Sequence, residues 1–315
     1  MIPIPNIYPP GPNTISGDQI TANRLANSPP LLARAMRDLA SYRYIGGLLL
    51  PNRVPTTSGS INYEEVGEGI TPADTPSQVA PGAEYQLTQI GNGTAATAAT
   101  GKWGQDSLIT DESVSRFSFP AITKALTKLV NAAKILIDTS VTAAVNASIT
   151  TNTAAAAAKW DGSGTAAKIL LDVAKAKAAI TTTGLGYNPN LLLVSDETMP
   201  YLIADEKIAA LMAREDRTNP IYTGQFSVLA GLEVMSVPAA NLPGGASTAA
   251  FVLDRAQLGF ILTENLGGEY QSAGDLVEMK SWRPDDTDAT RVRARSVFKA
   301  VITDPLAAYR ITAVL

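Results

Sequence analysis

The longest periodic segment of the chain, residues 120–149, reads PAITKALTKLVNAAKILIDTSVTAAVNASI. Apolar side chains recur along it at spacings of three and four residues, which is the period of one face of an α-helix. Pro120 suits the first helical position, and Ser118 is a candidate N-cap. The segment therefore predicts a single helix of roughly 45 Å. The charged side chains expected off its apolar stripe are Lys124, Lys128 and Asp138.

Upstream of this helix lie two segments that have too few large apolar residues to form a core. Seven of the chain's 20 prolines fall in the first 30 residues, which predicts an extended arm followed by a short helix over residues 31–42. Residues 61–115 hold eight acidic side chains and a single basic one, Lys102. Alternating pieces at 60–66 and 84–90 predict a long two-stranded excursion, and such a hairpin is marginal in water without a neighbour.

Downstream of the long helix the pattern alternates between helices and apolar strands, which indicates a mixed α/β region. Helices are expected over 166–180, 199–203 with Asp196 as cap, and 206–214. Strands are expected at 191–194, in a hairpin of 226–229 with 232–237, and at 249–253. The chain then closes with strands at 276–282, 290–302 and 309–314, so the fold class is α+β.

Composition excludes most catalytic machinery. The 315 residues include no histidine and no cysteine, which excludes disulfides, thiolate and imidazole metal sites, cysteine nucleophiles and triads with a histidine base. We therefore expect no catalytic residue, no metal and no cofactor. Charged residues make up 17%, below the roughly 25% of soluble proteins, and aromatic residues only 6%. The apolar surplus is largely alanine, so we expect faces that need partners.

Net charge and hydropathy restrict the partners further. A net charge of −4 is unlike that of a chain whose main task is to bind nucleic acid. The first residues lack the pattern of a signal peptide, and no apolar run approaches the roughly 18 residues that span a bilayer. The sequence thus predicts a soluble protein with no membrane partner.

Three arginines form the main candidate binding site. Arg291, Arg293 and Arg295 share one face of a predicted strand because side chains alternate along a strand. A row of salt bridges to neighbouring acids is the simpler interpretation. Contact with nucleic-acid phosphates is the alternative.

The other candidate clusters have simpler explanations. The acidic group Asp285, Asp286 and Asp288 lacks the spacing of a calcium loop, and a solvated turn explains it. Asp111 and Glu112 are expected to be favourable near a helix N-terminus rather than to form a general acid and base. The glycine pairs at 162–164, 91–93 and 267–268 lack a phosphate-loop signature and are interpreted as turns.

In this order the elements resemble the major capsid protein of tailed bacteriophages, which has the Hong Kong 97-like fold. Three stretches carry the resemblance: residues 60–66 with 84–88 and 109–112, residues 188–196 with 229–234, and residues 291–309. They are similar to the family's E-loop leading to its spine helix, its axial domain and the closing strands of its peripheral domain. The domains implied are an arm at 1–43, an E-loop at 55–106, a peripheral domain at 44–54, 107–163 and 276–315, and an axial domain at 164–275.

The resemblance implies a shell of hexamers and pentamers that encloses double-stranded DNA. It places the subunit in the virion, assembled in the host cytoplasm, with a portal protein and, in some shells, a decoration protein as further partners. If the three arginines face the lumen, they favour DNA as its content. Some relatives join neighbours covalently through a lysine in the E-loop, but residues 61–101 contain no lysine, so we expect non-covalent shells. Because Met1 directly precedes the arm, a separate scaffolding protein, or assembly without one, is expected.

Two other classes of protein stay open at this stage. An encapsulin resembles the same fold but encloses enzymes rather than a genome. A carboxylate-dependent hydrolase, such as a glycosidase, would need two carboxyl groups a few ångströms apart in a cleft, and only three tryptophans are present to line one.

Overall fold

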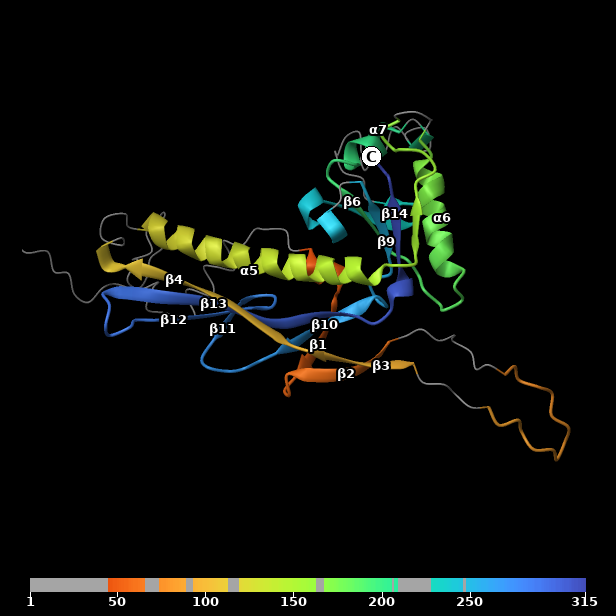
Figure 1. The fold of residues 1–315 in the computed structure, drawn as a ribbon, viewed down its shortest axis with the longest axis horizontal. Coiled ribbons are helices and arrows are strands. Elements are labelled where there is room, and N and C mark those ends of the chain that lie inside the picture. Colours follow the sequence, from red (N-terminus) through yellow and green to blue (C-terminus); the bar gives the residue numbers. More distant parts are fainter. Residues whose placement is uncertain are drawn as a thin grey trace, which may run out of the picture. The chain divides into compact units, whose positions relative to one another are not determined.

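The computed structural model describes residues 45–65, 74–88, 93–112, 119–162, 167–205, 207–208, 228–245 and 248–315 (Figure 1). The chain divides into two compact units. Within the described residues the first unit holds 101–136 and 266–297, and the second holds 45–100, 137–265 and 298–315. The expected arm and the helix at 31–42 lie outside the described residues, as do Ser118 and most of the helix expected at 206–214.

The long helix is confirmed as α5, Phe119–Ser148, which has 30 residues. Its apolar stripe is buried, as the spacing predicted. The buried members of the stripe are Leu126, Leu129, Val130, Ile137, Val141 and Val145.

Asp138 was expected off the buried stripe of α5, and this expectation was wrong. Asp138 is only 1% exposed. Its carboxylate accepts hydrogen bonds from the amide N–H groups of Ile45, at 3.2 Å, and Gly46, at 2.7 Å. These amides begin the short helix α3, Gly46–Leu49. A buried carboxylate at this position is stable because each of these backbone donors would otherwise lack an acceptor.

The first unit is built on long antiparallel strands. Strand β13, Ala289–Ile302, pairs antiparallel with β12, Val277–Trp282, and β12 with β11, Gln271–Gly274. Strand β4, Gly101–Thr110, also pairs with β13. Strands β12 and β13 agree with the sequence, whereas β4 and β11 were not expected, because neither has a regular apolar alternation.

In the second unit, a short hairpin forms the base of the excursion. Strand β2, Ser60–Glu65, pairs antiparallel with β3, Thr94–Ala99. The expected partner at 84–90 was wrong, since residues 84–88 form no strand. The reason is burial: Ala98 of β3 packs with Leu262 and Val301, whereas 84–88 has no apolar surface against it.

Beside this hairpin, β1, Asn52–Thr56, runs parallel to β10, Gly259–Glu264. Strand β10 pairs antiparallel with the last residues of β13. Neither β1 nor β10 was expected from the sequence.

The mixed sheet of the second unit has the order β5-β14-β9-β6-β8-β7. Its strands are β5, Thr153–Ala155; β6, Leu191–Ser195; β7, Val228–Leu229; β8, Leu232–Val237; β9, Ala250–Leu253; and β14, Ala308–Thr312. Strands β6 and β9 are fully buried, which explains their unbroken apolar sequences. Helix α6, Ile169–Thr181, packs on β14 and β9 and closes the core.

Helix α7, Met199–Ala204, and three 3-10 turns complete this unit. The turns are η1, Ala239–Asn241, η2, Pro243–Gly245, and η3, Pro305–Ala307. Asp196 was expected to cap α7, but the N-cap residue is Thr198. A tight turn causes the difference: the amide of Thr198 donates to the carbonyl of Ser195, so the helix begins two residues later.

The division into peripheral and axial domains stays a prediction. Two pairings bear on its boundaries: β5 and β14, expected in the peripheral domain, pair within the mixed sheet, whereas β10, expected in the axial domain, pairs with β13. None of the described helices is both long and apolar enough to cross a membrane.

Candidate functional site

Arg291, Arg293 and Arg295 lie on β13 at alternate positions, so their side chains share one face of the strand. Their side-chain exposure falls along the strand, from 45% at Arg291 through 39% at Arg293 to 5% at Arg295. The row therefore runs from solvent into the interior of the first unit. The environment of each arginine differs accordingly.

Asp106 on β4 serves both outer arginines. Arg293 binds it with two parallel hydrogen bonds, Nε to Oδ1 at 2.5 Å and Nη2 to Oδ2 at 2.7 Å, and Arg291 Nη2 lies 2.8 Å from Oδ2. The hydrogen bonds from Arg293, more than any other cause, lower the pKa of Asp106. Two guanidinium groups on one carboxylate leave this end of the row with a surplus positive charge.

The inner arginine is held by a different set of groups. Arg295 Nε donates to Glu278 Oε2 at 2.6 Å, and its Nη2 donates to the carbonyl of Gly267 at 2.6 Å. Its guanidinium also lies 3.5 Å from the centre of the Tyr270 ring. Gly267 has φ +64° and belongs to the turn expected there. Arg295 is thus held by a carboxylate, a backbone carbonyl and an aromatic ring.

An aromatic ring covers the outer pair as well. Arg293 lies 4.9 Å and Arg291 5.6 Å from the centre of the Trp282 ring, a distance at which a cation is attracted to the ring face. The interpretation of the arginines as a row of salt bridges is confirmed. Their contact with DNA stays a prediction.

The acidic candidates are placed near this row. Asp111 and Glu112 are helical residues directly after β4, and their expected role near a helix N-terminus stays a prediction. The carboxylate of Asp111 also binds Arg283, with Nη2 to Oδ2 at 2.6 Å. Asp285, Asp286 and Asp288 lie exposed in the turn before β13, and Asp288 is 3.6 Å from Arg283. No group of three potential metal-ligating side chains occurs in the described part of the chain.

Sequence reasoning missed a buried acidic cluster in the second unit. The Tyr187 hydroxyl donates to the carboxylate of Asp304, and Asp254 lies near enough to raise the pKa of both. Burial is the larger cause of each rise. Asp254 and Asp304 are each 3% exposed and accept backbone amides, such as those of Asn188 and Leu306. These buried carboxyl groups hold loops together.

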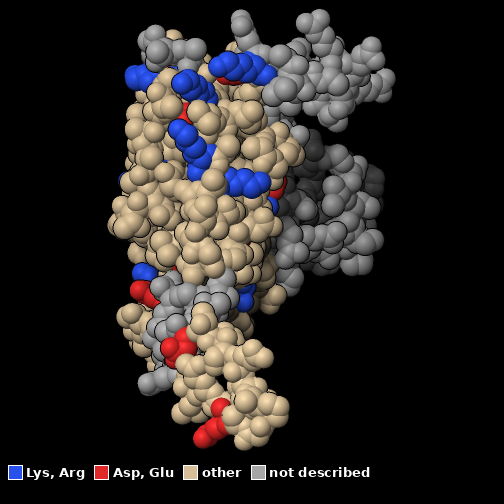
Figure 2. Space-filling model, turned by 90° about the vertical axis from the view of Figure 1, so that its right-hand side faces the viewer, with Lys and Arg blue, Asp and Glu red and all other residues tan. Residues whose placement is uncertain are grey.

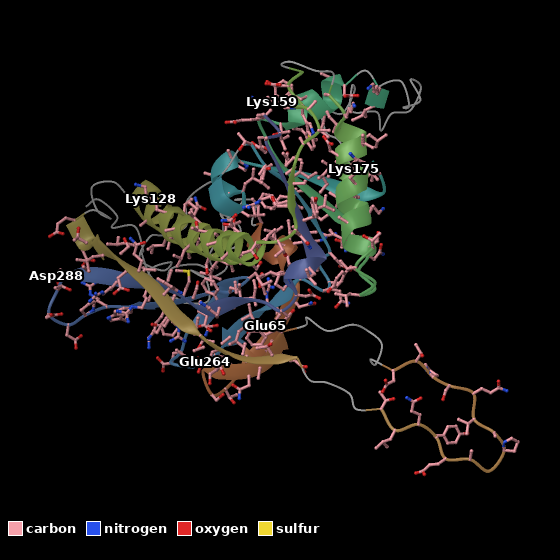
Figure 3. The ribbon with its side chains drawn as sticks, turned by 45° about the vertical axis from the view of Figure 1, so that its right-hand side comes forward. Glu65, Lys128, Lys159, Lys175, Glu264 and Asp288 are labelled. Atoms are coloured by element: carbon pink, nitrogen blue, oxygen red, sulfur yellow. The ribbon has the colours of Figure 1, made fainter. Side chains whose placement is uncertain are left out.

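Basic side chains gather on the outer side of α6, the face shown in Figure 2. Lys159, Lys168 and Lys175 are exposed, and Lys159 and Lys175 are labelled in Figure 3. The acid of this helix, Asp172, is buried and accepts the indole N–H of Trp160. These three lysines form no ion pair with another described residue, so this side of the helix is positive.

The excursion carries the most exposed large apolar side chains of the described chain. Leu87 is 98% exposed and Tyr85 83%. The base of the excursion is fixed where Thr100 donates its hydroxyl to Glu264 at 2.6 Å and its amide to Gly59. The segment is thus anchored at its base, while its apolar side chains have no cover from the described part of the same subunit.

Comparison with protein families gives a match over residues 93–311 to the model described as phage capsid protein. The chain belongs to the phage capsid protein family. As a capsid protein it is a component of the virion. A comparison of its sequence with curated proteins finds no match.

Solved structures agree with the Hong Kong 97-like fold of this capsid protein. The capsid of the cyanophage P-SCSP1u superposes with a TM-score of 0.62 at 13% identity, over 84% of this chain and 86% of that one. A structure from Mycobacterium phage Che8 gives 0.54 at 13% identity, over 88% and 90%. An encapsulin complex from Synechococcus elongatus PCC 7942 gives 0.52 at 11% identity, over 84% and 85%. The expected α+β capsid fold is confirmed.

Proposed function

We propose that this chain is the major capsid protein of a tailed phage and self-assembles as hexamers and pentamers into an icosahedral shell around double-stranded DNA. Assembly takes place in the host cytoplasm with a portal protein, a separate scaffolding protein and, in some shells, a decoration protein. The subunit is structural and performs no catalysis. Its domains follow the division into arm, E-loop, peripheral and axial parts.

The excursion is the observation that carries this proposal. A shell subunit needs surfaces that only a neighbour covers, and Tyr85 and Leu87 form such a surface at 83% and 98% exposure. Burying a side chain of this size is favourable by about 1.5–3 kcal/mol. In a monomer Tyr85 and Leu87 stay in water and contribute no such stabilisation. In an assembly each interface that buries them is stabilised by that free energy.

Electron microscopy of the purified protein tests the assembly directly. Closed particles of uniform diameter are expected, and sedimentation should place nearly all the protein in megadalton species. A preparation that contains only monomers or small oligomers, at concentrations where related subunits would associate, contradicts the proposal and returns the carboxylate hydrolase to consideration.

Shells held by non-covalent contacts follow from the lack of a lysine within residues 61–101. Boiling the particles in detergent should release one band of 33.0 kDa. A ladder of multimers that survives boiling would show covalent joining and would overturn this part of the proposal.

Contact between the outer arginines and packaged DNA is supported by the two guanidinium groups that share one carboxylate. Arg291 is the more exposed of the two, so Arg291→Gln should lower the DNA retained by particles in raised salt. Lys175→Gln on α6 is the matched control for loss of one positive charge. An equal loss from both variants, or from Lys175→Gln alone, would place the contact elsewhere.

An encapsulin shell is the second candidate, because the same fold occurs in the encapsulin complex with a TM-score of 0.52. The family match over residues 93–311 favours the phage capsid. Particles purified from the natural source should absorb at 260 nm as DNA-filled shells do. Particles filled with a second protein instead would favour the encapsulin.

A further inference from the structure

The outer side of helix α6 carries an apolar stripe, although a helix that covers a sheet usually has a polar outer side. Leu171, Ala174 and Ala178 follow one another at spacings of three and four residues, so they lie on one face of the helix. All three are exposed, and Leu171 is 45% exposed. Val173 and Ile180 point the other way and are completely buried in the core of the second unit. Helix α6 therefore has an apolar surface beyond the one that packs on its own sheet.

Lysines border this apolar stripe on both sides. Lys168, directly before the helix, and Lys175 lie along one edge of the stripe, and Lys177 lies along the other. Lys168 and Lys175 are exposed, while Lys177 donates to the carbonyl of Ala230 at 3.0 Å. The single acid of α6, Asp172, is buried on the opposite face. The edges of the stripe are therefore positive, and the helix itself contributes no exposed carboxylate to balance them (Figure 2).

This pattern is typical of a helix that packs against a second helix. In paired helices an apolar seam recurs at spacings of three and four residues, and charged side chains beside the seam select the partner. The 13 residues of α6 span about 20 Å, which is roughly two heptads of such a seam. Small alanine side chains at the seam allow the two helix axes to approach closely. Lysines at both edges select glutamate or aspartate at the facing positions of the partner.

Two other partners fit this face less well. A second copy of α6 would bring lysine against lysine, and like charges that face each other at an interface are unfavourable. DNA would contact the lysines through its phosphates, but it would leave Leu171 and the alanines without an apolar neighbour. The face therefore favours a partner that has both carboxylates and an apolar stripe.

We propose that the outer face of α6 binds an acidic amphipathic helix of a separate protein. Apolar side chains of that helix pack on Leu171, Ala174 and Ala178, and its carboxylates pair with Lys168 and Lys175. Exposed ion pairs contribute little affinity each, so the apolar stripe provides most of the binding and the lysines provide the preference for an acidic partner. This contact goes beyond the proposed shell function, because it requires only the second unit of one subunit.

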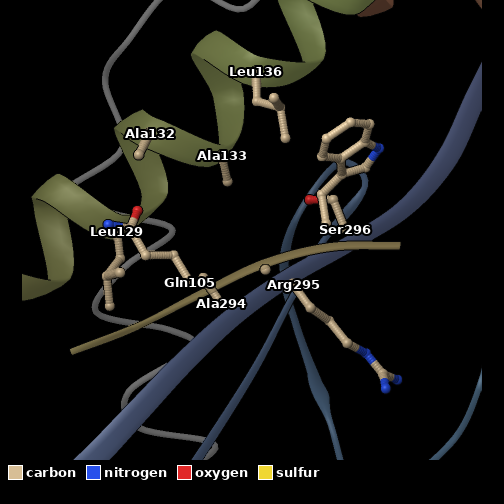
Figure 4. Close-up of a pocket in the computed structure, with 10 residues that line it drawn as sticks. Gln105, Leu129, Ala132, Ala133, Leu136, Ala294, Arg295 and Ser296 are labelled. Carbon is tan, nitrogen blue, oxygen red and sulfur yellow. The ribbon is translucent and has the colours of Figure 1, made fainter. Parts of the chain in front are cut away.

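A second apolar surface, in the first unit, differs from this face in its charge. It is a cavity of about 300 Å³ between α5, β4 and β13, and Leu129 and Leu136 of α5 line it (Figure 4). Its one charged lining residue is Arg295, whose guanidinium points away toward Glu278. This cavity offers apolar area without a preference for acidic partners, so it supplies the matched control for binding that is only hydrophobic.

A synthetic peptide tests the charge preference of the α6 face. The probe is a fluorescently labelled peptide of three heptads with leucine at the a and d positions and glutamate at e and g, and a second peptide carries lysine at e and g. Fluorescence anisotropy with the unassembled subunit should show that the acidic peptide binds roughly tenfold more tightly than the basic one. The double variant Lys168→Glu with Lys175→Glu should reverse this preference, and the difference should shrink as salt rises. Lys128→Glu, an exposed lysine of α5, is the matched charge control and should leave the preference unchanged.

The apolar part of the contact is tested separately. Leu171→Ala should weaken binding of the acidic peptide by roughly three- to tenfold, and this loss should be the same at low and high salt because it removes no charge. Leu136→Ala in the cavity of Figure 4 is the matched control and should not alter the affinity. Urea unfolding of each variant shows that it is folded before the titration.

Four results would overturn the proposal. The acidic peptide could bind no more tightly than the basic one, or Leu136→Ala could weaken binding as much as Leu171→Ala, which would place the peptide in the cavity. A DNA duplex that binds more tightly than the acidic peptide, and whose affinity Leu171→Ala leaves unchanged, would make this face a phosphate-binding surface. A dimer of the unassembled subunit that Leu171→Ala dissociates would place a second copy on the face. Failure of the unmodified protein to form particles counts against the shell function alone.

Discussion

Asp138→Ala should detach residues 45–50 from helix α5. The carboxylate accepts two amides at the start of α3, from Ile45 at 3.2 Å and from Gly46 at 2.7 Å. Leu49 and Leu50 follow immediately, and both are completely buried. The single side chain therefore holds both the first turn of α3 and the apolar residues behind it.

The size of the effect follows from the number of donors left without an acceptor. A buried donor that loses its partner costs about 1–3 kcal/mol, so losing both acceptors should lower the free energy of unfolding by about 2–6 kcal/mol. Asp138→Asn can keep an oxygen at the Oδ1 position, which accepts both amides, and should therefore cost less than Asp138→Ala. Since whole domains are stable by about 5–15 kcal/mol, the alanine variant should approach the limit of folding.

Urea unfolding of the unassembled subunit, followed by circular dichroism, measures these differences. Asp196→Ala is the matched control, because Asp196 has an exposed side chain and its loss should cost less than about 0.5 kcal/mol. The expected order of stability is control, then asparagine, then alanine. If Asp138→Ala unfolds within about 0.5 kcal/mol of the control, or if the asparagine and alanine variants are equally destabilised, the amide contacts do not hold this segment.

Three further changes follow from the geometry. The hydrogen bonds from Arg293 lower the pKa of Asp106 in the folded state, so this stabilisation is present above the unfolded pKa of about 3.9 and is lost as pH falls through the folded pKa. Asp106→Asn should therefore lower the urea midpoint at pH 7 and weaken the fall of that midpoint with decreasing pH. An equally steep fall in the variant would contradict this. Ala230 has φ +51° in the β7–β8 turn, so Ala230→Gly should stabilise by about 0.5–1 kcal/mol in thermal melts, and a lower Tm would refute the strain. In Gly259→Ala the new methyl would overlap the Val301 carbonyl across the β10–β13 pair, so a loss of about 1–3 kcal/mol is expected, and an unchanged midpoint would show that the strands separate freely.

The candidate site was predicted only in part. Alternation along one strand was enough to place the arginines on one face, and the choice of salt bridges over free charges was correct. The identity of the partners could not be predicted, because Asp106 is 187 residues from Arg293. Trp282 pairs with Arg291 across the expected β12–β13 hairpin, but its ring contact, like that of Tyr270 with Arg295, depends on side-chain geometry that no sequence pattern encodes.

The sequence alone determined the elements whose signal is local. Helix α5 follows from apolar residues at helical spacing, and the buried strands β6 and β9 follow from short apolar runs, because neighbours along the chain decide which face of an element is apolar. The lack of a core in the excursion was equally visible, since burial needs large apolar residues and that segment has few.

The tertiary structure alone decided which elements meet. In the structure β3, and not the expected strand at 84–90, pairs with β2. The carboxylate of Asp138 is buried and accepts two backbone amides, and Asp106 forms ion pairs with the arginines of β13. Each outcome depends on contacts between residues far apart in sequence. The folded arrangement is the one that buries the most apolar surface while leaving the fewest polar groups unpaired. Residues 84–88 find no such partner within the described part of the subunit, so Tyr85 and Leu87 stay exposed.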